Sequence, residues 1–430
     1  MAAAETLTIH LPGGAILARR RDNLIHARGI RYAHATRFAR PQALPDWEGI
    51  WDCTGPASVC PQNASRLARV TGVLEGNRDQ NEDCLHVSVV APTTVRAAPV
   101  MVFLHGGAYV TGGGDLDAYS PHKLAKEGVV AVTITHRLGV FGYLPIPDLA
   151  PANLGLLDQI EAMRWIQKNI KAFGGDPNNV TVFGQSAGAD AIYCLLVADN
   201  TDELFHRAIL QSLPLGRLYD ENRDKMTRAM SQHASNALSP ADLVVAPVSH
   251  LLDLQKQLLG VARSVSPALL PFGPIFGEHP LPPENILSDR FIAAARRKPL
   301  FVGYTANEET AFTHIDSREQ APAYLYNLFQ GETDHLLQHT STALGRGLPS
   351  YEIRWYTKGN GDLQATHCIE LPFLLGDWPA WKHAPMLQGA DAEEGVERVG
   401  TSVRNLWVAF ARGEDLGGRK YIIDETFKFP

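Results

Sequence analysis

The fold is decided by the stretch Val180-Thr-Val-Phe-Gly184-Gln185-Ser186-Ala187-Gly188, in which an apolar run leads into a Gly-x-Ser-x-Gly turn. A run compatible with a helix, residues 189–197, follows directly. A sharp turn from strand to helix strains the central serine and presents its hydroxyl beside the helix N-terminus, and the flanking glycines allow close packing. The short pattern also arises by chance as an ordinary turn, but its position between a strand and a helix favours Ser186 as a nucleophile.

Other apolar runs bounded by turn residues lie on both sides of this stretch, with helical segments between them. Such alternation predicts an α/β fold with a mostly parallel sheet and helices on both faces. Several runs are continuously apolar, as expected for strands that are buried on both faces. The expected strands are residues 100–104, 129–135, 180–184, 208–211 and 300–303.

A helix is expected between the second and third of these strands. Apolar side chains recur at helical spacing from Leu156 to Ile170. Asn153 stands where a helix N-cap is expected, and Gly174 stands where the helix should stop. Together with its flanking strands, this segment makes a βαβ unit.

Size and composition are those of a globular protein with enough apolar material for a core. The chain has 430 residues, of which 45% are apolar and 20% are charged. Length alone allows about three domains. Two segments, about 219–283 and 321–348, are rich in helical patterns and are interpreted as insertions beside the sheet.

Charge and hydropathy exclude some partners. The net charge of -7 comes without a long run of one sign, so no nucleic-acid partner is expected. No run reaches about 18 apolar residues, so no membrane span is expected. The N-terminal Met1-Ala-Ala-Ala-Glu-Thr lacks the features of a signal peptide, which predicts a cytoplasmic protein, or a secreted one only if a presequence was removed. The oligomeric state is left open.

A glycine-rich turn after the strand at 100–104 is the candidate oxyanion hole. The sequence His105-Gly106-Gly107-Ala108 leaves backbone amides uncovered by side chains. We expect the N–H groups of Gly107, Ala108 and Ala187 to converge on the negative charge that develops during acyl transfer. The alternatives are a flexible surface turn or a dinucleotide loop, but no Gly-x-Gly-x-x-Gly motif opens a helix here.

A serine nucleophile also needs a histidine base and a carboxylate that orients it, in the chain order serine, acid, histidine. The strand at 300–303 leads to Glu308 and Glu309, which places carboxylates just past the carboxyl end of a strand. Spacing alone does not choose between the two. The downstream candidates for the base are His314, His335, His339, His367 and His383.

Short motifs along nearly the whole chain match one known family. They are Gly29-Ile-Arg-Tyr-Ala33, Asn81-Glu-Asp-Cys84, His105-Gly-Gly-Ala-Tyr109, His136-Arg-Leu-Gly-Val-Phe-Gly142, Asn169-Ile-Lys-Ala-Phe-Gly-Gly-Asp176, Gly184-Gln-Ser-Ala-Gly188 and Asn405-Leu-Trp407. With these motifs the chain resembles the type-B carboxylesterases, the group that also contains the cholinesterases. The resemblance implies an α/β-hydrolase fold and one catalytic domain over residues 1–430. The chain is short for the family, which implies a reduced helical cap.

The resemblance also implies roles for individual residues. The family's acid aligns with Glu308 in Gly303-Tyr-Thr-Ala-Asn307-Glu308-Glu309, and its histidine aligns with His367 in His367-Cys-Ile-Glu-Leu-Pro-Phe373. Glu309 stands where the family usually has glycine, so the choice between the glutamates needs a direct test. Cys60 and Cys84 resemble the family's loop-closing pair, which implies either a disulfide or two buried thiols.

The expected function is that of a serine carboxylic-ester hydrolase that forms an acyl-enzyme on Ser186 without a metal or cofactor. Gln185 replaces the glutamate of cholinesterases, and residues 60–82 contain no aromatic side chain, so choline esters are poor candidates. The alternatives are a biosynthetic enzyme that acylates an alcohol, forms a lactone or catalyses an elimination, and a binding protein without activity. Candidate pocket residues, each also compatible with a place in the core, are Tyr109, Gln185, Phe272, Phe276, Phe312, Phe373 and Trp378.

Overall fold

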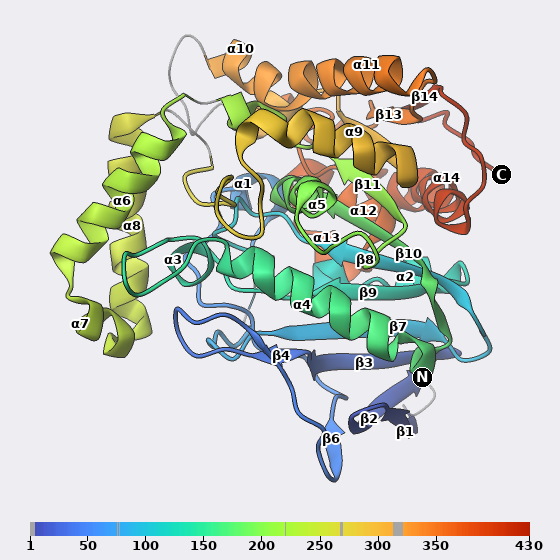
Figure 1. Cartoon of the computed structure of the whole chain (residues 1–430). Coiled ribbons are helices and arrows are strands. Elements are labelled where there is room, and N and C mark those ends of the chain that lie inside the picture. The colour runs from blue at the N-terminus through green and yellow to red at the C-terminus, as the bar shows by residue number, and fades with distance from the viewer. Residues whose placement is uncertain (1–4, 75, 77, 220, 267–269, 313–320) are drawn as a thin grey trace.

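The structure is a computed structural model that describes residues 5–74, 76, 78–219, 221–266, 270–312 and 321–430. Within these residues the main sheet has 12 strands (Figure 1). In spatial order they are β1 (Glu5–Leu11), β2 (Gly14–Arg21), β3 (Leu24–Arg31), β7 (His86–Pro92), β9 (Val130–Ile134), β8 (Ala98–Leu104), β10 (Gly175–Gln185), β11 (Arg207–Gln211), β12 (Leu300–Thr305), β13 (Ser350–Ile353) and β14 (Lys420–Ile423), with β6 (Ile50–Asp52) beside β2. A small separate sheet pairs β4 (Ala33–His34) with β5 (Gln42–Ala43).

The sheet is parallel over most of its width. Every neighbouring pair from β9 to β14 is parallel, whereas β1, β2, β3, β7 and β9 pair in antiparallel fashion. All five strands expected from the sequence are present, as β8 to β12. The predicted α/β architecture is therefore confirmed, and an antiparallel edge built from the N-terminal residues is added to it.

Helices cover both faces of the sheet, and each face has its own apolar core. Val100 and Val102 of β8 pack in a cluster with α4 (Leu154–Asn169) and α5 (Ala187–Val197). Met101 and Phe103 point to the opposite face, because successive side chains of a strand alternate, and they pack with α2 (His122–Lys126) and α14 (Ala392–Arg412). This double covering explains why the central strands are continuously apolar.

Asn153 stands at the predicted N-cap position of α4, but its side chain does not cap the helix. The side chain makes no capping hydrogen bond, and the φ of Asn153 is +65°. The side-chain amide instead donates to the carbonyls of Ile275 and Glu278 and accepts from the Ile275 N–H group. The buried side chain therefore joins the start of α4 to a distant loop.

The two segments interpreted as insertions carry helices at the periphery of the sheet. The first contains α6 (Arg223–Ala237), α7 (Pro240–Val245) and α8 (Val248–Val265), which lie together at the left of Figure 1. The second contains α10 (Ala321–Tyr326) and α11 (Glu332–Leu344), joined by the π-helical turn η6 (Asn327–Gly331). The remaining α-helices of the described chain are α1 (Ala68–Thr71), α3 (Gly139–Gly142), α9 (Leu287–Arg297), α12 (Leu371–Leu374) and α13 (Trp378–Trp381). The assignment of one domain stays a prediction.

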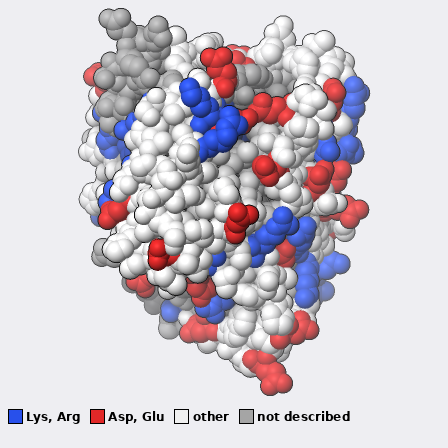
Figure 2. All heavy atoms as spheres, turned by 60° about the vertical axis from the view of Figure 1, so that its left-hand side comes forward, with Lys and Arg blue, Asp and Glu red and all other residues white. Residues whose placement is uncertain are grey.

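On the face shown in Figure 2, small groups of basic and acidic side chains are scattered between broad uncharged areas. Among the helices that the structure describes, none is both long enough and apolar enough to cross a bilayer.

Candidate active site

Ser186 occupies the turn between β10 and α5. Its φ is +57° and its ψ is -123°, a strained conformation for a residue with a side chain. Its N–H group donates to the Gln211 carbonyl at 2.8 Å, and its own carbonyl accepts from the Asp190 N–H group at 3.0 Å. The backbone is therefore held firmly on both sides of the hydroxyl group, as a nucleophile elbow requires.

Glycine is required on both sides of this turn because the backbones approach closely. A Cβ atom on Gly188 would lie 2.0 Å from the Leu104 carbonyl oxygen, and one on Gly184 would lie 2.7 Å from the Gly188 carbonyl carbon. The elbow is thus packed directly against the end of β8, where the glycine-rich turn begins.

That glycine-rich turn supplies two of the expected amide donors. Gly107 has a φ of +111° and Ala108 a φ of +56°, and both line the same pocket as Ser186. Within the described residues, neither amide makes a hydrogen bond. Ala187 is the first residue of α5, where N–H groups have no partner inside the helix. The amides of Gly107 and Ala108 therefore have no competing partner within the described residues, and the convergence of all three donors stays a prediction.

Gly106 has a structural place in this turn. A Cβ atom there would lie 2.7 Å from the Gln185 carbonyl oxygen, so the turn packs on the residue before the nucleophile. The Gly106 carbonyl accepts from His105 Nδ1 at 2.8 Å. Burial lowers the pKa of His105 to about 4, so this imidazole stays neutral and orients the turn.

His367 and Glu308 form a buried pair. His367 Nδ1 donates to Glu308 Oε2, and Glu308 Oε1 accepts from the Thr305 N–H group at 2.8 Å. Both side chains are fully buried. The imidazole packs against Phe312 and Phe329, with ring centroids 5.1 and 4.8 Å away. His367, the histidine that the family resemblance indicated, therefore has a fixed orientation and a carboxylate partner.

The other candidates for the acid and the base lie away from this buried pair. Glu309 is only half-buried and makes no hydrogen bond with His367. His335, His339 and His383 are exposed, and His314 lies outside the described residues. Of the described alternatives, only Glu308 and His367 form the acid and base arrangement that a serine nucleophile needs.

Gln185 contacts the base rather than the pocket. Its Nε2 atom donates to His367 Nε2 at 3.0 Å. The proton on Nδ1 faces Glu308, so Nε2 is the accepting nitrogen of the neutral ring. Among the described hydrogen bonds, none joins Ser186 Oγ to His367, and such bonds are often long before substrate binds. The Gln185 amide is therefore hydrogen-bonded to the same His367 nitrogen that would accept the serine proton.

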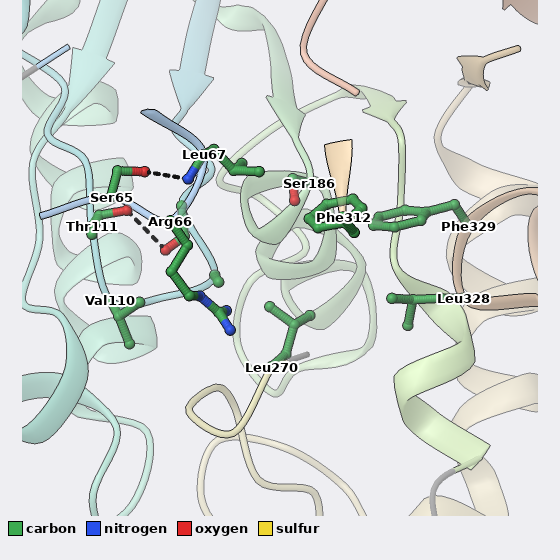
Figure 3. A pocket seen from close by; sticks show the side chains of 12 residues that line it. Ser65, Arg66, Leu67, Val110, Thr111, Ser186, Leu270, Phe312, Leu328 and Phe329 are labelled. Carbon is green, nitrogen blue, oxygen red and sulfur yellow. Dashed lines mark hydrogen bonds between the residues drawn. The ribbon is translucent and has the colours of Figure 1, made fainter. Parts of the chain in front are cut away.

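The pocket at Ser186 encloses about 490 Å³ of empty space, part of it open to solvent (Figure 3). Of the expected pocket aromatics only Phe312 lines it. The sequence did not point to most of the pocket wall. Many of the lining residues come from the loop before α1, from the end of the first insertion and from η6. The lining residues are Ser65, Arg66, Leu67, Gly107, Ala108, Val110, Thr111, Ser186, Leu270, Phe312, Leu328 and Phe329.

Besides Gln185, five expected pocket residues lie outside its wall. Tyr109 is buried and donates its hydroxyl proton to Asp190 of α5. Phe272 is fully buried. Phe276, in the first insertion, packs its ring against the guanidinium of buried Arg217. Phe373 belongs to α12 and is fully buried, and Trp378 begins α13. An aromatic side chain serves a core and a pocket equally well, so the sequence could not separate these roles.

The cysteine pair is not bridged in the structure. Cys60 and Cys84 are both free thiols, as are Cys53, Cys194 and Cys368. Contact with Cys60, together with burial, raises the pKa of the Cys84 thiol. The structure describes the pair as two buried thiols, and the choice between a disulfide and two thiols stays a prediction.

A second buried carboxyl, Glu370, lies behind the base. Neither of its oxygens has a hydrogen-bond partner among the described residues. Burial, and then the charge of Glu308, raise its pKa from 4.5 to about 7. The folded protein therefore keeps this proton to a higher pH than the unfolded chain does, and the free energy of unfolding falls as the pH rises from about 4.5 to about 7.

Glu370→Gln should remove this pH dependence. One pKa unit corresponds to about 1.4 kcal/mol, so the variant should gain up to about 3 kcal/mol relative to the wild type between pH 5 and pH 8. Urea unfolding of both proteins across this range measures the difference. A difference that stays constant with pH would show that Glu370 ionises as easily in the folded protein as in the unfolded chain.

Comparison with known proteins identifies the family of this chain. The model of the carboxylesterase family matches residues 6–341. The chain belongs to the carboxylesterase family. This carboxylesterase is 33% identical to a probable N-octanoylanthranilate hydrolase of Rhodococcus erythropolis, over 94% of this chain and 92% of the relative. It is 31% identical to a para-nitrobenzyl esterase of Bacillus subtilis, over 91% and 87% of the two chains.

Solved structures agree with the fold. A crystallised PNB esterase superposes with a TM-score of 0.80 at 26% identity and covers 97% of this carboxylesterase and 96% of its own chain. The predicted family and α/β-hydrolase fold are confirmed. The protein is a serine ester hydrolase that acts on small-molecule esters, and the biosynthetic and non-catalytic alternatives are not favoured.

Proposed function

We propose that this carboxylesterase works through an acyl-enzyme on Ser186, with His367 as the base and Glu308 as the acid that orients it. The observation that carries the proposal is the buried His367–Glu308 hydrogen bond beside the strained serine. Fixed orientation of the imidazole is what a triad needs, because the carboxylate stabilises the imidazolium that forms during the reaction.

In the first step Ser186 Oγ attacks the ester carbonyl and its proton passes to His367 Nε2. The N–H groups of Gly107, Ala108 and Ala187 bind the oxyanion of the tetrahedral intermediate. The intermediate collapses, the carbon–oxygen bond to the alcohol breaks, and His367 returns the proton to the leaving oxygen. Water then attacks the acyl-enzyme with the same base, which releases the acid and restores Ser186.

Gln185 must give way in the first step. Its amide holds His367 Nε2 in the described structure, and Ser186 Oγ has to take that place before proton transfer. The side-chain amide of Gln185 carries no charge, so breaking this bond leaves no charge of Gln185 unpaired. Gln185 is thus a positioning residue that holds the His367 ring in place before the ester binds.

The acyl-enzyme predicts a constant product ratio. Several esters with one acyl group and different alcohols should form the same intermediate, so an added acceptor alcohol should divide it between ester and acid in one fixed ratio. Chromatographic product analysis measures this ratio at a fixed acceptor concentration. A ratio that changes with the leaving alcohol would contradict the common intermediate, and a product that is mainly ester at low acceptor concentration would favour a biosynthetic acyltransferase.

Two of the relatives are named esterases and two are named hydrolases. Their names differ in substrate, so they do not define the acyl group. The pocket itself argues against choline esters. It contains Arg66, whose positive charge repels a quaternary ammonium, and a trimethylammonium group would need an aromatic face with nearby negative charge.

A further inference from the structure

Arg66 lies in the wall of the Ser186 pocket. It belongs to the loop between β6 and α1, and Figure 3 shows its side chain extending along the cavity toward Leu270. Among the described lining residues it alone carries a charge, and the others are apolar, glycine or uncharged hydroxyl side chains. The pocket therefore combines an apolar surface with one guanidinium group.

The loop that carries Arg66 is fixed on both sides of this residue. Before it, Gln62 exchanges two hydrogen bonds with the backbone of Gly112, at 2.7 and 2.8 Å, and is itself buried. Asn63 donates to the Leu252 carbonyl of α8 at 3.1 Å. After it, the Ser65 hydroxyl accepts from the Leu67 N–H group at 3.2 Å. Arg66 is thus presented from a rigid loop.

The guanidinium is charged at neutral pH. Burial, and then repulsion from Arg263 of α8, lower the pKa of Arg66 to about 10, which is still well above neutrality. Arg66 therefore brings its charge into the pocket, whereas Arg263 is exposed and lies outside the lining. An anion that entered the pocket would gain more from the Arg66 charge than in water, because the wall is apolar.

We propose that Arg66 recognises a carboxylate on the substrate, so that the preferred substrates are esters that join an apolar group to one carboxylate. This inference rests on the proposed function of Ser186. A guanidinium presents parallel N–H donors that match a carboxylate in geometry, and such charge-assisted pairs are stronger than neutral hydrogen bonds. The apolar wall formed by Leu270, Leu328 and Phe329 takes the hydrocarbon part of the ester.

A matched set of aryl hexanoates tests the proposal. Each ring carries a carboxylate at the ortho, meta or para position, and its partner carries a neutral carboxamide at the same position. The wild type should prefer the carboxylate at one ring position or more, as judged by kcat/KM. Arg66→Gln should lower kcat/KM for that carboxylate by about 10- to 100-fold, mainly through KM, and change the carboxamide by less than about threefold.

Two further variants sharpen the test. Arg66→Lys keeps the charge but loses the planar fork and should fall between the wild type and Arg66→Gln. Arg263→Gln, on the exposed side of α8, should reduce the preference by only a few-fold, because a solvated charge acts weakly. Equal turnover of both esters by the wild type at every ring position would overturn the proposal. An equal loss on both esters in Arg66→Gln would also overturn it, whereas continued turnover of the carboxamide shows that acyl transfer itself is intact.

Discussion

Ser186→Ala is expected to lower kcat for esters by on the order of 10⁵-fold or more, because the reaction then has no nucleophile to carry the acyl group. Residual turnover should come only from binding and from the amide donors of Gly107, Ala108 and Ala187. Initial rates with an aryl ester, measured on protein that has been freed of contaminating wild type, give the loss.

A matched serine variant separates this effect from misfolding. Ser264 is exposed on α8 and bonds only to the Val261 carbonyl, so Ser264→Ala should keep wild-type activity. Thermal melts of all three proteins should agree closely, since the Ser186 side chain makes no hydrogen bond within the described structure. A Ser186→Ala enzyme that keeps more than about a hundredth of wild-type kcat would argue against a serine nucleophile.

Glu308→Gln should lower kcat by about 10³- to 10⁴-fold. An uncharged amide cannot stabilise the imidazolium, and its NH₂ group in the place of Oε2 would face the proton on His367 Nδ1 and favour the wrong tautomer. Glu309→Gln is the natural control, because the neighbouring carboxylate is half-buried and does not contact the base.

The pair of variants decides which glutamate serves the triad. Glu309→Gln should stay within about threefold of the wild type in kcat, as expected for a change outside the triad. Steady-state kinetics on both proteins, with melting temperatures as a check on folding, make the comparison. A larger loss in Glu309→Gln than in Glu308→Gln would reverse the assignment.

The parts of the site that the sequence could predict are those fixed by local backbone chemistry. Ser186 and the turn at Gly106–Ala108 depend on glycine at particular positions, and these glycines are visible in the sequence. Spacing alone did not separate Glu308 from Glu309, whereas the family resemblance pointed to Glu308. The folded turn distinguishes the two directly, since the Thr305 N–H group binds Glu308 and directs it inward.

The parts that could not be predicted depend on long-range packing. Arg66, Leu328 and Phe329 reach the pocket from segments far from Ser186 in the sequence, and no local pattern marks them. The strands of the sheet likewise differ in how clearly the sequence marks them. The central strands were evident from their continuous apolar runs, whereas β1 and β2 at the edge are partly exposed, mixed in polarity and easily overlooked.

The central claim, that Ser186 is the nucleophile, is tested most directly by labelling with a fluorophosphonate, which reacts covalently with an activated serine. Intact mass should show one adduct per wild-type chain, peptide mapping should place it on Ser186, and Ser186→Ala should remain unlabelled under the same conditions. A folded wild type that stays unlabelled, or an adduct that persists in Ser186→Ala, would contradict the account.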